Sequence, residues 1–193
     1  MTDERVSPRT AGGRYSATTV ALVGYMGAGK TSVGEALAAR LGWGFVDLDR
    51  SIEAREGRTV PHIFAEDGEK RFRDLECEIL QQTIAAPDST SLVLALGGGA
   101  FVSESVRELL RQREIPTVWL DAPAQELFRR CEGPEVVRPL RRNLQEFSEL
   151  YEQRLSSYRQ ADLHVITSSK DISAVVDEIL EELALVPGSR SSG

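Results

Sequence analysis

A lysine preceded by three glycines stands where an apolar run ends and an amphipathic pattern begins. The stretch Gly24-Tyr-Met-Gly-Ala-Gly-Lys-Thr31 matches G-x-x-x-x-G-K-[ST] in full, directly after the apolar run 19–23. Glycines let successive backbone N–H groups converge on an anion, and a following helix adds the positive end of its dipole. We expect Lys30 to reach the β- and γ-phosphates of a nucleotide and the Thr31 hydroxyl to ligate Mg²⁺. The alternative is a glycine-rich turn without a ligand, which suits this motif and context poorly.

Two aspartates follow the next apolar run, in FVDLDRSIE. Asp47 and Asp49 alternate along a segment expected to be extended, so their side chains should point to opposite sides and have different roles. Asp47 could hold a metal-bound water, and Asp49 could face an acceptor hydroxyl as hydrogen-bond acceptor or base. The plainer alternative is that Asp49 caps a helix starting at Ser51. The position of the pair after the second strand of a phosphate-loop fold favours the chemical interpretation.

Two further stretches suit an anionic or closely approaching ligand. Arg73 precedes Glu76 by three residues, so the two side chains can meet on one helical face. The alternatives are a solvent-exposed ion pair and a guanidinium fork that grips a substrate carboxylate. The glycine run 97–99 follows the third apolar run directly. Since glycine weakens a strand, three in succession suggest backbone brought close to a ligand, the alternative being a tight turn.

A basic segment interrupts an acidic chain between residues 128 and 143, FRRCEGPEVVRPLRRN. Its arginines are Arg129, Arg130, Arg138, Arg141 and Arg142. Such a segment could be a mobile lid that closes over phosphates, excludes water and steadies developing charge, or simply a solvated basic loop. Further on, Arg154 and Tyr158 stand four residues apart. Arg154 is a second candidate for a carboxylate clamp, although both residues could equally lie on the surface.

The hydrophobic pattern predicts a scaffold for these groups. Five short apolar or β-branched runs read as strands, at 19–23, 45–48, 92–96, 117–120 and 163–167. Their nearly continuous apolar character suits strands buried on both faces of a parallel sheet. Amphipathic stripes between them read as helices, and the segment 63–80 reads as two helices separated by a turn at Asp67-Gly68. This alternation predicts an α/β sandwich with right-handed crossovers, whose ligands bind at the carboxyl ends of the strands.

Length and composition narrow the class of protein. The chain has 193 residues, 41% of them hydrophobic, which predicts one domain over 17–186 between a disordered leader (1–16) and a flexible tail (187–193). The formal net charge of −7 argues against a nucleic-acid partner. Apolar runs fall short of a membrane span, and the two cysteines match no metal spacing and are expected as reduced thiols. A cytoplasmic protein is therefore expected.

The motifs, taken in order, resemble those of shikimate kinases. The matching pieces are GYMGAGKTSVG, FVDLDRSIE, IFAEDGEKRFRDLE, LALGGGA, VRPL and YEQRLSSYR, over about residues 18–183. The resemblance implies phosphorylation of the 3-hydroxyl of shikimate by MgATP, in the pathway to chorismate and aromatic amino acids. It implies a nucleoside-monophosphate-kinase-like P-loop fold, a three-layer sandwich with a five-stranded parallel sheet of order 2-3-1-4-5 and a mobile lid. Shikimate and ATP are then the expected partners of a monomer that binds neither nucleic acid nor membrane.

The resemblance also assigns roles to matching positions of this sequence. The catalytic residues would be Lys30, Asp49 and Arg138. ATP would contact Gly27, Ala28, Gly29, Lys30, Thr31, Ser32, Arg130 and Arg138, with Arg130 along the adenine. Shikimate would contact Asp49, Arg73, Gly98, Gly99 and Arg154, with the two arginines on its carboxylate. Mg²⁺ would be bound by Thr31 directly and by Asp47 through water. The substrate-binding segment would span about 49–77 and the lid about 129–143.

The lid departs from the family pattern in two ways. It is one residue longer, with Pro134 inserted near its tip, and it reads RPLRR where the family usually continues with a leucine. The working lid arginine therefore stays open among Arg138, Arg141 and Arg142. The stretch 168–172, which flanks the adenine in relatives, carries no assigned contacts.

Two other functions fit part of the pattern. The first is another small-molecule P-loop kinase such as a gluconate kinase, because Arg73 and Arg154 indicate a carboxylated acceptor without distinguishing a cyclic acid from a linear one. The second is a non-catalytic relative that binds ATP and a ligand. Its mark would be the loss of Lys30, Asp49 or Arg73, and all three are present.

Overall fold

Five parallel strands form a single sheet in the computed structural model, which describes residues 18–85, 91–131 and 143–185. The strands are β1 (Thr19–Val23), β2 (Gly44–Asp47), β3 (Leu92–Ala95), β4 (Thr117–Asp121) and β5 (Leu163–Ile166). Their order in the sheet is β2-β3-β1-β4-β5. Each strand agrees with its predicted range to within one residue at either end. The predicted fold class and strand order are confirmed.

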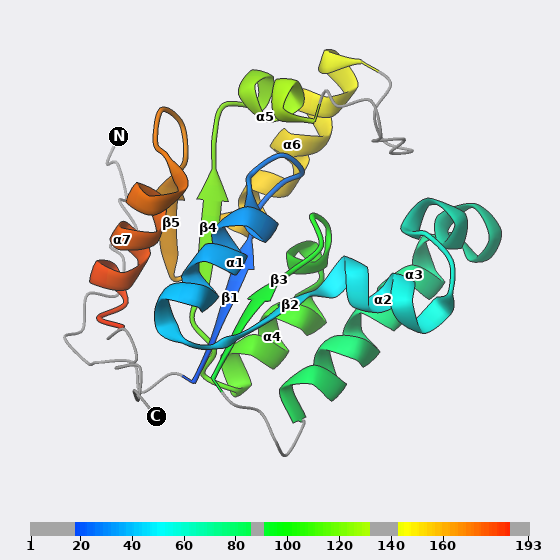
Figure 1. The fold of residues 1–193 in the computed structure, drawn as a ribbon. Coiled ribbons are helices and arrows are strands. Elements are labelled where there is room, and N and C mark those ends of the chain that lie inside the picture. Colours follow the sequence, from blue (N-terminus) through cyan, green and yellow to red (C-terminus); the bar gives the residue numbers. More distant parts are fainter. Residues whose placement is uncertain (1–17, 86–90, 132–142, 186–193) are drawn as a thin grey trace, which may run out of the picture.

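Helices cover both faces of the sheet (Figure 1). They are α1 (Lys30–Leu41), α2 (Leu48–Glu56), α3 (Val60–Ala85), α4 (Glu104–Gln112), α5 (Ala124–Arg130), α6 (Leu144–Tyr158) and α7 (Ile172–Glu182), with the short 3₁₀ helix η1 (Ala100–Val102). The chain moves outward from β1 to the edge strand β2, then back through β3 and across to β4 and β5. Because parallel crossovers are right-handed, this reversal places α1 on one face and α3, α4 and α6 on the other.

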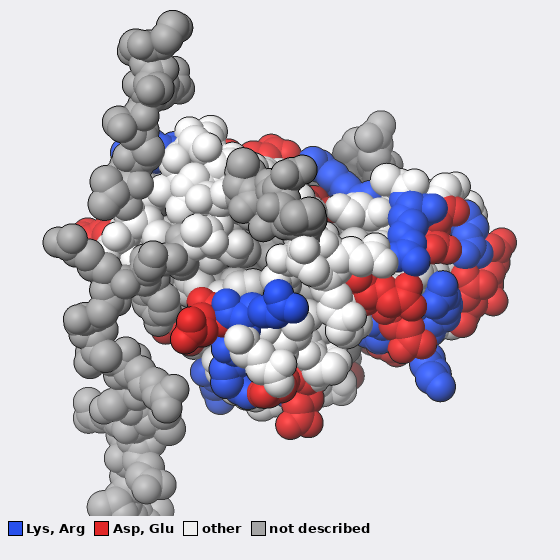
Figure 2. All heavy atoms as spheres, turned by 90° about the horizontal axis from the view of Figure 1, so that it is seen from below, with Lys and Arg blue, Asp and Glu red and all other residues white. Residues whose placement is uncertain are grey.

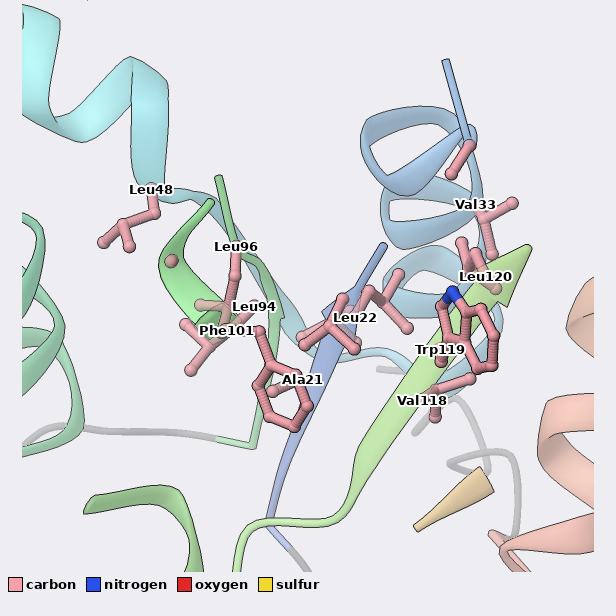
Figure 3. Close-up of a cluster of buried hydrophobic side chains, with 14 of the residues drawn as sticks. Ala21, Leu22, Val33, Leu48, Leu94, Leu96, Phe101, Val118, Trp119 and Leu120 are labelled. Atoms are coloured by element: carbon pink, nitrogen blue, oxygen red, sulfur yellow. The ribbon is translucent and has the colours of Figure 1, made fainter. Parts of the chain in front are cut away.

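The hydrophobic core is built around the central strands of the sheet. Every residue of β3 and β4 is buried, which explains the wholly apolar sequence of β3 and the apolar centre of β4 between Thr117 and Asp121. Figure 3 shows Leu22 of β1, Leu94 of β3 and Val118 of β4 in one cluster with Val33 of α1 and Phe101 of η1. Burying side chains of this size contributes about 1.5–3 kcal/mol each. The loops that follow β1 and β3 therefore start from a rigid platform.

A single glycine divides α3. Gly68 has φ +80° and ψ 170° inside an otherwise helical span, an angle pair that a side-chain-bearing residue rarely adopts. The predicted turn at Asp67-Gly68 is thus present as a sharp break between two helical halves. The second half then buries Phe72, Leu75 and Glu76. The break separates this buried half from the first half, in which only Ile63 is buried.

The segment after β2 differs from the prediction. The extended backbone ends at Asp47, which is the N-cap of α2 and accepts a hydrogen bond from Arg50 N at 3.2 Å. Asp49 therefore lies in the first turn of α2, where an acidic side chain suits the helix dipole. The expected extended alternation of the two aspartates is wrong, and so is the alternative that Asp49 caps a helix starting at Ser51. The capping strength of Asp47 explains the earlier helix start.

On the face shown in Figure 2, charges of both signs lie next to one another, mostly at the right of the view and at its lower centre, and much of the remaining described surface is uncharged. No helix among the described residues is long and apolar enough to cross a membrane. The predicted leader, the predicted tail and most of the predicted lid, with Arg138, Arg141 and Arg142, lie outside the described residues.

Candidate active site

A cavity of about 850 Å³ lies at the carboxyl ends of β2 and β3, beside the loop that follows β1. Its walls come from that loop, from α2, from both halves of α3, from the glycine run after β3 and from α6. Eleven of the predicted site residues line it: Gly27, Gly29, Lys30, Thr31, Ser32, Asp47, Asp49, Arg73, Gly98, Gly99 and Arg154. Segments far apart in the chain meet here, at the edge where parallel α/β sheets bind ligands.

The loop after β1 takes backbone angles that need glycine. Gly24, Gly27 and Gly29 have φ of +139°, +81° and +90°. Gly29 is the N-cap of α1, so the first N–H groups of that helix face the loop with no side chain at the cap. The Lys30 ammonium donates to the carbonyls of Gly24 at 2.9 Å and Tyr25 at 3.0 Å. The loop thus directs backbone donors and a cation into one space, as phosphate binding requires.

Thr31 and Asp47 form an oxygen-rich corner of the cavity. The Thr31 hydroxyl donates to Asp47 Oδ2 at 2.8 Å, and the N-cap bond from Arg50 N fixes the other carboxylate oxygen. Hydroxyl and carboxylate oxygens are the donors that Mg²⁺ prefers, usually with several retained waters. Within the described residues no group of three or more His, Cys, Asp or Glu side chains could hold a metal. Thr31 and Asp47 are the residues of this corner that could hold a magnesium ion.

Two carboxyl groups meet at Gly97. A Cβ at this glycine would lie 2.5 Å from Asp49 Oδ1 and 2.7 Å from Glu76 Oε1, so the position admits no side chain and the two carboxyl groups are neighbours. The Glu76 side chain is 1% exposed. Burial raises the pKa of Glu76 to about 7, although the charge of Arg73 and the hydrogen bond from it lower this pKa. A protonated Glu76 leaves Asp49 as the carboxylate that can accept a hydrogen bond from an acceptor hydroxyl.

Arg73 stands beside these carboxyl groups. Its guanidinium donates to Glu76 Oε2 and, at 3.3 Å, to Glu69 Oε1. It also lies 5.9 Å from the ring centroid of Phe64 and 5.3 Å from that of Phe72. The predicted ion pair between Arg73 and Glu76 is present, but the Glu76 carboxylate is buried in the cavity wall. A simple solvent-exposed ion pair is therefore the wrong alternative.

Arg154 approaches the glycine run from α6. Its Nη1 donates to the Gly98 carbonyl at 3.0 Å, and the hydroxyl of Tyr158 donates to the same carbonyl. Tyr158 is fully buried and Arg154 lines the cavity, so the alternative that both lie on the surface is wrong. A Cβ at Gly99 would collide with the guanidinium of Arg73. The glycine run thus passes between two arginines, and its first and last positions leave no room for a side chain.

Three predicted site residues do not line this cavity. Ala28 is 1% exposed and belongs to the core. Arg130, on α5, donates to Thr167 Oγ1 at 2.9 Å and to the Thr167 carbonyl at 3.2 Å. Arg138 lies outside the described residues.

Other cavity residues were missed by the sequence reasoning. They include Met26, Glu53, Thr59, Val60, Pro61 and His62. Glu53 accepts a hydrogen bond from Val60 N at 2.8 Å, which joins α2 to the start of α3. The one available signal was Val60-Pro61 after Gly57, a pattern typical of a helix end followed by a new helix start. It indicates where the chain turns, but not that the turn faces a cavity.

Comparisons with known proteins agree with this geometry. The family model for shikimate kinase matches residues 26–184. A shikimate kinase of Persephonella marina is 41% identical over 160 residues, which cover 82% of this chain and 94% of that protein. A shikimate kinase of Ruegeria pomeroyi is 38% identical over 94% of this chain and 93% of its own length. The chain belongs to the shikimate kinase family. It is therefore a phosphotransferase, as the resemblance to shikimate kinases implies.

Solved shikimate kinases share the fold. The structure from Acinetobacter baumannii, described as a complex with shikimate, has a TM-score of 0.80 and 35% identity over 88% of this chain and 94% of that one. A gluconokinase from Sinorhizobium meliloti has a TM-score of 0.58 at 20% identity, which reflects the fold alone. The predicted resemblance to shikimate kinases is confirmed at the level of the family.

Proposed function

We propose that this chain transfers the γ-phosphoryl group of ATP to the 3-hydroxyl of shikimate, in the pathway to chorismate and aromatic amino acids. The observation that carries the proposal is the arrangement of charges in the cavity. Arg73 and Arg154 line it together with Asp49, and Lys30 lines it from the phosphate loop. An acceptor with a carboxylate at one end and hydroxyls at the other fits between these groups.

The nucleotide side of the cavity would hold the phosphates. The N–H groups at the start of α1 and the Lys30 ammonium would bind the β- and γ-phosphates, so that Lys30 exchanges its loop carbonyls for phosphate oxygens. Thr31 would bind Mg²⁺ directly and Asp47 through a water, and when bound the ion neutralises charge on the phosphate oxygens. Arg130 would lie along the adenine. A lid arginine, Arg138 or its neighbours Arg141 and Arg142, would close over the phosphates.

The acceptor side would orient the attacking hydroxyl. Arg73 and Arg154 would bind the shikimate carboxylate, while Asp49 and the backbone of Gly98 and Gly99 hold its ring and hydroxyls. In the reaction the 3-oxygen forms a bond to the γ-phosphorus as the bond from that phosphorus to the bridging oxygen of ADP breaks. The hydroxyl proton passes to Asp49 or to solvent. Since the transition state is loose, catalysis depends on alignment and charge more than on a strong base.

The decisive experiment is a coupled ADP-release assay with shikimate, quinate and gluconate offered separately at equal concentration. We expect turnover with shikimate to exceed that with the other two acids by at least tenfold. Lys30→Ala should abolish it, whereas Lys70→Ala, which removes an exposed lysine of α3, should leave it unchanged. Gluconate turnover with none for shikimate would favour the gluconate kinase alternative. ATP binding without turnover of any acid would favour the non-catalytic one.

A further inference from the structure

The carbonyl of Gly98 accepts two side-chain hydrogen bonds from one helix. Arg154 Nη1 donates at 3.0 Å, and the Tyr158 hydroxyl, one helical turn further along α6, donates to the same oxygen. Gly98 itself lies beside the phosphate loop, because a Cβ at this position would stand 3.5 Å from Met26 N. The two donors therefore anchor the backbone that joins the nucleotide and acceptor halves of the cavity.

The two donors differ in freedom. Tyr158 has 0% exposure, and its ring stacks on Trp119 with centroids 5.9 Å apart. Trp119 stacks in turn on His164 at 3.9 Å. Burial raises the pKa of the Tyr158 hydroxyl, so it keeps its proton and remains a donor throughout the ordinary pH range. Tyr158 is thus a fixed donor, held between α6 and the β4–β5 half of the sheet.

Arg154 is the donor that faces the cavity. Its guanidinium lies 5.4 Å from the ring centroid of Tyr25 and lines the cavity wall. Under the proposed function this guanidinium binds the acceptor carboxylate. An ion pair with a carboxylate, in which both partners are charged and the geometry can be bidentate, is stronger than a single bond to a neutral carbonyl, so the acceptor competes with Gly98 for Arg154. Without another donor, the carbonyl would then lose its side-chain partner at the moment the acceptor binds.

We propose that Tyr158 is a positioning residue for acceptor binding, because its hydroxyl keeps the Gly98 carbonyl paired when Arg154 moves to the acceptor carboxylate. The inference rests on the proposed function. Tyr158 touches neither substrate in this arrangement and acts only through the glycine backbone. Its effect belongs to acceptor binding, whereas nucleotide binding and the transfer step depend on other groups.

The test is a double-mutant comparison of kcat/KM for shikimate at saturating MgATP. In Tyr158→Phe the free enzyme still pairs the carbonyl through Arg154, and acceptor binding breaks that bond. The kcat/KM should therefore fall about tenfold, the scale of one hydrogen bond to a buried carbonyl, through a higher KM and a nearly unchanged kcat. In an Arg154→Ala background, acceptor binding removes no hydrogen bond from the Gly98 carbonyl, because Arg154 is absent both before and after the acceptor binds. Adding Tyr158→Phe there should change kcat/KM by less than about twofold.

Tyr151→Phe is the matched control. Tyr151 is also a buried tyrosine of α6, but its hydroxyl donates to Asp121 Oδ1 at 2.7 Å and not to the glycine run. This variant should lose thermal stability as much as Tyr158→Phe or more, with the KM for shikimate within about twofold of the parent chain. If lost stability alone raised the KM for shikimate, both tyrosine variants would show the increase. An increase in Tyr158→Phe only indicates the positioning role.

Several outcomes would overturn the inference. A tenfold loss in both backgrounds would mean that Tyr158 acts independently of Arg154, and no loss in either would mean that its hydroxyl is dispensable. If Tyr158→Phe fails to fold, hydrogen exchange of residues 96–100 in the unaltered chain decides. Protection unchanged by shikimate supports the inference, and protection lost on adding shikimate contradicts it. An unaltered chain that binds ATP but does not turn over shikimate would instead refute the proposed function, and this inference with it.

Discussion

Arg73 donates to a Glu76 carboxylate that is almost completely buried, with a side-chain exposure of 1% against 24% for the arginine. The second oxygen of Glu76 faces Gly97 beside Asp49 and has no hydrogen-bond partner among the described residues. Burying a carboxylate with only one of its oxygens paired costs free energy of folding, so this ion pair is poor evidence of a purely stabilising role. Because burial raises the pKa of Glu76 to about 7, this carboxyl group places a proton in the cavity wall near neutral pH.

The first prediction concerns stability as a function of pH. Burial raises the pKa of Glu76 to about 7 from an ordinary value of 4.5. The folded protein therefore binds this proton more tightly than the unfolded chain, and the contribution is present below pH 4.5 and lost as the pH rises to about 7. Glu76→Gln should remove up to about 3 kcal/mol of this decline in unfolding free energy. Urea denaturation at pH 5 and pH 7.5 measures it.

Glu78→Gln is the control for that measurement. Glu78 lies on the same helix, is 43% exposed and pairs with Arg55 and Arg71. Its replacement should leave the pH dependence of the parent chain intact. An equal pH dependence for Glu76→Gln and the parent chain would show that Glu76 does not titrate in this range.

The second prediction concerns the acceptor clamp. Arg73→Ala should raise the KM for shikimate at least tenfold and leave the KM for ATP nearly unchanged, because under the proposed function the guanidinium binds the acceptor and not the nucleotide. It should also lower stability above about pH 7, where Glu76 loses the guanidinium that favours its charged form, and much less at pH 5, where Glu76 keeps its proton. Steady-state kinetics and urea denaturation measure the two effects. Arg71→Ala, which removes an arginine 46% exposed on the same helix, should do neither. Unchanged shikimate affinity in Arg73→Ala would remove this residue from the site.

Strand positions and motif residues could be predicted from the sequence for physical reasons. A strand buried on both faces needs apolar residues throughout, so the five runs identified the sheet to within one residue. The backbone geometry of phosphate binding requires particular residue types at Gly24, Gly29 and Lys30. These positions are close in the sequence, so the requirement is visible as a short motif. Strands and short motifs depend on residues that are close in the sequence, so they can be recognised in one sequence without knowledge of the fold.

Features that depend on packing between distant segments could not be predicted. Asp47 and Leu48 were expected in extended backbone, but α2 begins one residue after Asp47 because that side chain caps it. The burial of Glu76 depends on how the second half of α3 lies against the sheet, and the Tyr158 bond spans 60 residues. A helical stripe indicates that such residues face inward, but not which backbone group they meet.

The third prediction tests the closeness of the glycine run to the carboxyl pair. In Gly97→Ala the new methyl group would stand 2.5 Å from Asp49 Oδ1 and 2.7 Å from Glu76 Oε1, too close for either to stay in place. A displacement of about 1 Å at a catalytic group can cost about a hundredfold in rate, so kcat should fall by that order with ATP binding retained. Gly98→Ala, whose nearest contact would be 3.5 Å, should lose much less. Equal losses in the two variants would contradict the crowding at Gly97.

The last prediction concerns Asp49, whose carboxylate lies beside Gly97 and, under the proposed function, faces the attacking hydroxyl. Asp49→Asn keeps the shape of the side chain and removes its charge and its ability to accept a proton. We expect kcat for shikimate to fall by about 10²–10⁴, the range for loss of a general base, while ATP binding measured by calorimetry stays within about twofold. Asp74→Asn, an exposed aspartate of α3, should retain full turnover. Because the neighbouring Glu76 carries its own carboxyl group, the double variant Asp49→Asn, Glu76→Gln separates their roles. If Asp49→Asn alone keeps normal turnover and the double variant does not, Glu76 rather than Asp49 serves the hydroxyl.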